Sequence, residues 1–212
     1  MRTCTLIIVS GLPATGKTVL SHKLAQHVNL PLISKDIIKE ILFDGVGHGD
    51  RAWGEKLNIP TYDLLDYFVE QELRAQHSLI IETPYDNDFR KARYTELQAK
   101  YSFMCIQVLC YAEPQVLIQR FIDRIGASDR HPGHNDTAAL EDFKASIRQA
   151  GKVEPLPLHG QVYEIDTTDF TAINETDLFR QVKELVIEST LNDLRNLVGE
   201  KTSKLTALFN KK

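Results

Sequence analysis

The stretch SGLPATGKTVL, residues 10–20, decides the fold. It follows the apolar run Leu6–Val9, and residues 11–18 fit the pattern G-x-x-x-x-G-K-[ST] of a phosphate-binding loop. Glycine lets the backbone wrap closely around a phosphate, so that successive N–H groups point inward, and the helix that follows adds the positive end of its dipole. Lys17 can then reach the β- and γ-phosphates, and the Thr18 hydroxyl can bind Mg²⁺. The chain is therefore expected to bind ATP and Mg²⁺, with these nucleotide contacts: Gly11, Leu12, Pro13, Ala14, Thr15, Gly16, Lys17 and Thr18.

Length and composition describe an ordinary globular chain. It has 212 residues, of which 42% are hydrophobic and 25% charged, and these values are typical of one folded domain. The net charge of -4 gives no general attraction to nucleic acid or to an anionic membrane. No apolar run approaches the roughly 18 residues that span a bilayer, and the N-terminus lacks the pattern of a signal peptide. The three cysteines lie within apolar runs, so we expect buried thiols in a cytoplasmic protein.

Short apolar runs alternate with amphipathic stretches along the chain. The runs predict strands at Thr5–Val9, Leu32–Ile33, Leu79–Ile81, Phe103–Leu109 and Val162–Ile165. The stretches predict helices at Thr18–Val28, Asp36–Phe43, Pro60–Arg74, Asp88–Lys100, Pro114–Arg124 and Asp177–Val198. Apolar strands that alternate with helices are typical of a sheet covered on two sides. We therefore predict an α/β fold, a parallel sheet of about five strands with helices on both faces.

Two stretches interrupt this alternation. Phe43–Pro60 contains four glycines, which we expect to be too many for a stable helix. Arg124–Asp136 is rich in Gly, Asp and His, and it lies between two predicted helices. Long loops in a compact domain are usually functional or mobile. We predict that the second stretch belongs to a mobile lid.

Asp36 opens the helix that follows the second predicted strand. An aspartate there can act as an N-cap, which stabilises a helix by about 1 kcal/mol. In a parallel sheet, however, the carboxyl end of the strand beside the phosphate-binding loop borders the ligand crevice, and we expect the second strand to hold that place. Asp36 could then accept the proton of an attacking hydroxyl. With a reference pKa near about 3.9 it is a weak base, so its main contribution would be to orient the nucleophile.

Glu82 ends the third predicted strand, in the segment LIIETPYDND. A carboxylate at this point can lie near Mg²⁺ or its water shell, as the Walker-B acid of a P-loop protein does. Walker-B strands usually end in aspartate, and here Asp86 and Asp88 follow only after a few residues, where either can instead cap the next helix. We name Glu82 as a metal and substrate contact, with a solvated strand-end acid as the alternative.

Three arginines lie in and beside the predicted lid. Arg120 and Arg124 are four apart on a helix and are expected to face the same way, and Arg130 follows in the loop. Guanidinium groups over a triphosphate neutralise charge that develops during transfer, which can be worth about 10³–10⁵ in rate. For any single arginine, a solvated helix face is the alternative. His131 and His134 flank Pro-Gly without a third ligand, so they give only weak support for a metal site.

Four motifs in order along the chain, GLPATGKT, SKD, LIIET and RFIDR…RHPGH, resemble those of a group of P-loop kinases. The group includes chloramphenicol phosphotransferase, the zeta toxins and the kinase domain of polynucleotide 5′-hydroxyl kinase. The resemblance covers about residues 3–170. It implies a P-loop NTPase fold and ATP-dependent transfer of phosphate to a hydroxyl. The segment IDTT, residues 165–168, resembles the one that precedes the adenine-contacting loop in this group.

The resemblance also implies roles for single residues. The catalytic residues by motif match are Lys17, Asp36 and Arg124, and the metal ligands are Thr18 and Glu82. Beyond the loop, the cofactor contacts are Arg120 and Arg130. The acceptor contacts are Asp36, Glu82, Arg51 and Trp53, because such kinases usually build the acceptor pocket where residues 44–58 lie in this chain. Trp53 can equally cover an edge of the core.

These roles predict one kinase domain over residues 1–199. We expect an acceptor-site insertion at about 44–60, a lid at about 120–136 and a flexible tail at 200–212. The favoured activity is phosphate transfer from ATP to a small-molecule hydroxyl.

Two other activities are alternatives. One is a polynucleotide 5′-hydroxyl kinase; in those enzymes an arginine closely follows the catalytic aspartate, whereas this chain reads Ile37-Ile38-Lys39, so a nucleic-acid partner is not expected. The other is a nucleotide-binding regulatory module with little transfer activity, which the missing Walker-B aspartate keeps open.

Overall fold

The computed structural model describes residues 4–84, 88–128, 130–149, 153–189 and 191. Its centre is one sheet whose strands are all parallel, in the order β2-β3-β1-β4-β5. The strands are β1 Thr5–Gly11, β2 Leu32–Ser34, β3 Leu79–Glu82, β4 Met104–Tyr111 and β5 Gly160–Asp166. The predicted five-stranded parallel sheet is confirmed.

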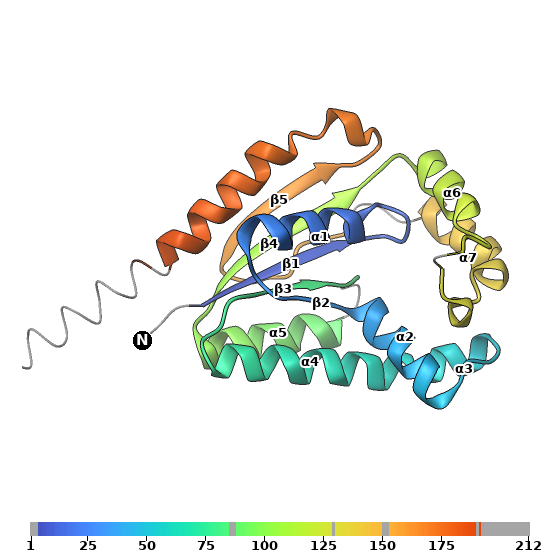
Figure 1. Cartoon of the computed structure of the whole chain (residues 1–212), viewed down its shortest axis with the longest axis horizontal. Helices are drawn as coiled ribbons and strands as arrows, with labels where there is room; N and C mark the ends of the chain where they lie inside the picture. Colours follow the sequence, from blue (N-terminus) through green and yellow to red (C-terminus); the bar gives the residue numbers. More distant parts are fainter. Residues whose placement is uncertain (1–3, 85–87, 129, 150–152, 190, 192–212) are drawn as a thin grey trace, which may run out of the picture.

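Helices connect the strands and extend beyond them (Figure 1). They are α1 Lys17–Val28, α2 Lys35–Val46, α3 Arg51–Lys56, α4 Asn58–Arg74, α5 Asp88–Tyr101, α6 Pro114–Asp123 and α7 Asp136–Gln149, with the short 3-10 helices η1 Pro132–His134 and η2 Phe170–Ala172. A last helix occupies residues 175–189. The remainder of its predicted span, residues 192–198, and the predicted tail, residues 200–212, lie outside the described residues.

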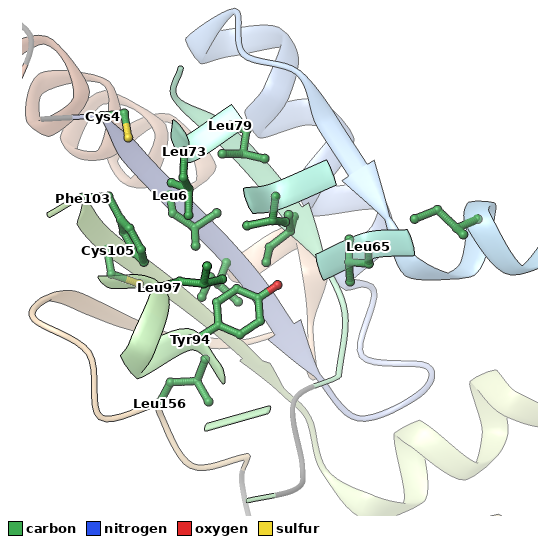
Figure 2. Close-up of a cluster of buried hydrophobic side chains, with 14 residues drawn as sticks. Cys4, Leu6, Leu65, Leu73, Leu79, Tyr94, Leu97, Phe103, Cys105 and Leu156 are labelled. Carbon is green, nitrogen blue, oxygen red and sulfur yellow. The ribbon is translucent and has the colours of Figure 1, made fainter. Parts of the chain in front are cut away.

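Helices cover both faces of the sheet, because its central strand is apolar on both sides. Ile7 and Val9 of β1 point into one core, together with residues of α1 and of the helix at 175–189. Leu6 and Ile8 point into the other core, which lies under α4 and α5 (Figure 2). Burial of this kind is worth about 1.5–3 kcal/mol for each large apolar side chain. The predicted two-sided coverage is therefore confirmed.

The three cysteines are free and buried, as expected. Cys4 and Cys105 belong to the core under α4 and α5, where both are labelled in Figure 2, and Cys110 belongs to the opposite core. Burial raises the pKa of both Cys105 and Cys110 to about 12, so neither thiol is an activated nucleophile. Among the described residues, no helix combines the length and the apolar character needed to cross a membrane.

Helices α6 and α7 form a separate layer beyond the carboxyl ends of the strands (Figure 1). This layer, with η1 between the two helices, is called the lid below. It has a small core of its own, in which the rings of Phe121 and Phe143 stack with 4.1 Å between their centroids. Leu12 and Ala14 of the phosphate loop pack against this core. The lid therefore rests directly on the phosphate loop.

The expectation that glycines keep Phe43–Pro60 from being helical is wrong. α2 continues to Val46, and residues 51–56 form the helix α3. The side chain of Asp50 accepts a hydrogen bond of 2.9 Å from the amide of Trp53, which caps α3 and offsets the low helix propensity of Gly54. A short helix that is held by its cap and by neighbouring elements shows little apolar periodicity in the sequence. The number of glycines therefore led to the wrong prediction of a non-helical segment.

Candidate active site

The phosphate loop joins β1 to α1 at the carboxyl edge of the sheet. Gly16 is the N-cap of α1 with φ 77, a left-handed conformation that glycine adopts without strain. The hydroxyl and the amide of Thr15 both donate to the carbonyl of Leu12, at 2.8 and 3.3 Å, which closes the turn. In the part of the chain that the structure describes, no backbone carbonyl engages the amides of Ala14, Gly16 and Lys17. These N–H groups are thus available to a phosphate, as the motif predicts.

Glu82 connects the phosphate loop to the neighbouring strand end. Its Oε1 lies 3.7 Å from Nζ of Lys17 and accepts a hydrogen bond of 3.3 Å from the hydroxyl of Thr18. Its Oε2 accepts a hydrogen bond of 2.5 Å from Ser34, at the end of β2. Glu82 is only 1% exposed, so it is not a solvated strand-end acid.

Asp86 and Asp88 follow Glu82 in the sequence. Asp86 lies outside the described residues, and Asp88 begins α5 with a side chain that is likewise outside the description.

Asp36 lies in the first turn of α2, after β2. The N-cap of that helix is Ser34, so the expected capping role of Asp36 is wrong. β2 also does not adjoin β1: β3 lies between them and brings Glu82 into the gap. The carboxylate of Asp36 lies 3.1 Å from Nζ of Lys35 and is 35% exposed. It therefore remains open to a ligand at the edge of the sheet.

Charges around Asp36 keep it ionised. Burial raises its pKa, but the positive charges of Lys35, Lys17 and His134 outweigh that effect, and the net pKa is well below the ordinary value. The charge of Lys17 acts on Asp36 although the two residues belong to different helices. A carboxylate with so low a pKa is a weak base. Asp36 is therefore better suited to orienting a hydroxyl.

The lid arginines converge on one acid. Asp136 receives hydrogen bonds from Arg124 at 3.1 Å and from Arg130 at 2.7 and 3.2 Å. Burial raises the pKa of Asp136. The hydrogen bond from Arg130 and the charge of Arg124 lower it by more than burial raises it, so the pKa of Asp136 lies below its ordinary value. Two guanidinium groups thus share one carboxylate. The Nε atom of Arg124 is buried and has no hydrogen-bond partner among the residues described.

Arg120 and Arg124 contact different groups, although they are four residues apart. Arg124 is the C-cap of α6 and donates to Asp136. Arg120 donates to the carbonyls of Thr167 and Thr168 at 2.8 and 3.1 Å. Its Nη1 is buried and has no hydrogen-bond partner within the described ranges.

Phe170 belongs to the site but was missed in the sequence. Its ring lies 4.2 Å from the guanidinium carbon of Arg120. A Cβ built on Gly16 would lie 2.2 Å from this ring, so Phe170 touches the phosphate loop directly. The available signal was the segment at residues 165–168, because it marks the loop in which Phe170 lies.

The lid is docked on α2 through an aromatic and acidic contact. Phe43 is 1% exposed and stacks on His131 at 5.3 Å between ring centroids. The amide of Gly133 donates to Nδ1 of His131, so the proton of that ring is on Nε2, which donates to Asp44 at 3.1 Å.

The second lid histidine makes a similar contact. Nε2 of His134 lies 2.7 Å from Glu40, and burial lowers the pKa of His134, as does the charge of Arg130, although Glu40 opposes them. Among the described residues, no group of three or more His, Cys, Asp or Glu side chains could hold a metal ion. His131 and His134 both contact residues of α2.

We expect Gly133→Ala to lower the free energy of unfolding by about 1–3 kcal/mol, the usual cost of overpacking a core. The new methyl would lie 2.5 to 2.8 Å from ring atoms of Phe43, and that ring cannot shift without breaking its stack on His131. Urea denaturation measures the loss. Gly45→Ala is the matched control, because nothing lies within 4 Å of its Cβ. Equal stability of Gly133→Ala and the wild type would show that the lid does not dock in this way.

Arg51 and Trp53 are exposed residues of α3, within the predicted acceptor segment. Arg51 pairs with Glu55 at 2.9 Å and with Asp142 of α7, and half of its side chain is exposed. Trp53 donates its ring N–H to the carbonyl of Gly47 at 2.8 Å. Both side chains are thus engaged within the protein, and their acceptor role stays a prediction.

Known proteins resemble the chain in sequence and in fold. A family model described as "AAA domain" matches residues 6–150. A presumed kinase from Chloroflexus aurantiacus is 34% identical with a TM-score of 0.78, over 87% of this chain and 98% of that one. The structure of APE1195 is 14% identical with a TM-score of 0.56, over 89% and 97% of the two chains, and shares the fold alone. None of the curated proteins matches the chain.

The family model covers more than half of the chain. The predicted P-loop NTPase fold and the resemblance to P-loop kinases are therefore confirmed. By its fold and its phosphate loop, the chain belongs to the AAA domain family as a P-loop kinase-like domain.

Proposed function

We propose that the protein is a phosphotransferase that moves the γ-phosphate of ATP to a hydroxyl of a small-molecule acceptor. The observation that carries the proposal is the bridge made by Glu82. It contacts Lys17 and Thr18 on the phosphate loop and Ser34 at the end of β2, two residues before Asp36. A phosphate site and a hydroxyl-orienting carboxylate therefore meet at one edge of the sheet.

The residues at this edge fit ATP and Mg²⁺. Buried nitrogens on Arg120 and Arg124 suit an anionic ligand, since neither has a hydrogen-bond acceptor among the residues that the structure describes. The hydroxyl of Thr18 and the carboxylate of Glu82 are oxygen ligands of the type that Mg²⁺ prefers. When bound, Mg²⁺ would neutralise charge on the phosphate oxygens.

The proposed step is a single displacement at phosphorus. The acceptor oxygen forms a bond to the γ-phosphorus, the bond from that phosphorus to the β-bridging oxygen breaks, and ADP leaves. Asp36 orients the hydroxyl and takes up its proton as the new bond forms. Lys17 and the lid arginines stabilise charge on the transferred group. Packing of the lid on the phosphate loop keeps water away from this step.

A transfer assay with Mg-ATP tests the proposal. The purified protein is incubated with nucleosides, sugars, aminoglycosides, chloramphenicol and 5′-hydroxyl oligonucleotides, and ³¹P signals of the products are recorded beside phosphate release. We expect a new phosphomonoester on a small molecule. Labelling of the oligonucleotides alone would favour a polynucleotide kinase instead. ATP binding without any transfer would favour a regulatory module.

A cytoplasmic location is part of the proposal. The cytoplasm supplies ATP, and it keeps thiols reduced, in agreement with the free cysteines.

A further inference from the structure

Lys39 is a buried cation that pairs with no acid in the described part of the chain. It lies on α2, three residues after Asp36, and is 9% exposed. Its Nζ donates a hydrogen bond of 2.8 Å to the side-chain oxygen of Asn58 and lies 5.4 Å from the centre of the Phe43 ring. Within the described ranges, no carboxylate lies within ion-pair distance of Lys39.

Burial of such a group is costly unless an anion compensates it. Burial lowers the pKa of Lys39 to about 8, and the charges of Lys35 and Arg130 act in the same direction. Asp36 and Glu55 oppose this shift from farther away. Asp36 is held by Lys35, and Glu55 by Arg51. The nearby acids are therefore committed to other cations.

The position of Lys39 relates it to the acceptor rather than to ATP. Residues three apart on a helix share a face, so Lys39 and Asp36 present their side chains on the same side of α2. The charge of Asp36 acts on Lys39. The charge of Arg130, in the lid, also acts on Lys39 from outside α2.

We propose that Lys39 binds an anionic group of the acceptor, so that the substrate is a small alcohol that also carries a carboxylate or a phosphate. This inference rests on the proposed function. It adds the class of the acceptor and the residue that selects it. A neutral alcohol would leave the Lys39 charge buried beside Asn58, whereas an anion at Nζ would compensate it.

Two variants separate anion binding from a purely structural role. Lys39→Met removes the charge and keeps the length of the side chain. Asn58→Asp keeps Lys39 but gives it a carboxylate at the atom that it already contacts at 2.8 Å. If Lys39 only joins α2 to α4, Asn58→Asp strengthens that contact and leaves acceptor choice unchanged. If Lys39 binds the acceptor, the new carboxylate of Asn58→Asp competes with the anionic group of the acceptor for the Lys39 charge.

The experiment compares kcat/KM for matched neutral and anionic alcohols: glucose with gluconate, ribose with ribose 5-phosphate, and adenosine with adenosine 3′-monophosphate. For the wild type, we expect at least a tenfold preference for the anionic member of a pair that is phosphorylated. Both variants should lower that preference by about tenfold. Lys56→Met, an exposed lysine on α3, is the control and should keep the wild-type ratio.

The outcomes distinguish this inference from the proposed function. Preference for a neutral alcohol, or an anionic preference that both variants retain, overturns the role of Lys39 and leaves phosphate transfer intact. Binding of ATP with transfer to no alcohol of either kind overturns the proposed function and this inference with it.

Discussion

Asp36→Asn is expected to lower transfer to the acceptor by at least about 100-fold, while the affinity for ATP changes by less than about threefold. A positioned carboxylate contributes about 10²–10⁴-fold to proton transfer, and asparagine keeps the shape but cannot take up the proton. The Asp36 carboxylate is on α2, whereas the phosphate-binding amides belong to the loop before α1. ATP binding should therefore survive. Initial rates and an equilibrium titration with ATP measure the two effects.

Asp63→Asn is the matched control, since Asp63 is an exposed aspartate on α4. Full transfer by Asp36→Asn would show that Asp36 is not the hydroxyl-orienting acid.

The depressed pKa of Asp36 also limits how the rate can depend on pH. Because the folded-state pKa lies below the ordinary value, Asp36 is ionised above about pH 4. The stability that its contacts contribute is present above that pH and is lost only as the pH falls further. Any acidic limb seen between pH 5 and 8 must then come from another group.

The sequence was enough to predict the elements whose signal is local. The glycines, lysine and threonine of the phosphate loop have a characteristic spacing. The apolar run of β1 and the amphipathic pattern of α1 flank that loop, so the positions of all three were predictable. Glu82 was predictable as a strand-end acid because parallel strands end at one edge of a sheet.

Other parts of the site depend on contacts between distant segments. β3 lies between β1 and β2 in the sheet. No local sequence pattern determines this order of strands. The same holds for Asp136, which collects both lid arginines, and for Phe170 beside Gly16. Lys39 looked like an ordinary helix-face lysine, and only its burial sets it apart.

Lys17→Ala is expected to reduce transfer by about 1,000-fold or more, because the lysine charge stabilises the transferred phosphate in a site that excludes water. Lys23→Ala is the control on the same helix, since Lys23 is half exposed and pairs with Glu175 on the surface. Lys17→Ala retaining more than a tenth of wild-type transfer would contradict the assignment.

Loss of Lys17 should also affect folding, which must be separated from catalysis. The side chains of Lys17 and Glu82 are 9% and 2% exposed, and removal of Lys17 leaves a buried carboxylate without its cation. Breaking such a pair costs about 3 kcal/mol. The double variant Lys17→Ala with Glu82→Gln removes that unpaired charge, so we expect it to regain most of the lost stability in urea denaturation but none of the lost transfer. If transfer returned along with stability, Lys17 would act by neutralising the buried charge of Glu82 and not by contacting phosphate.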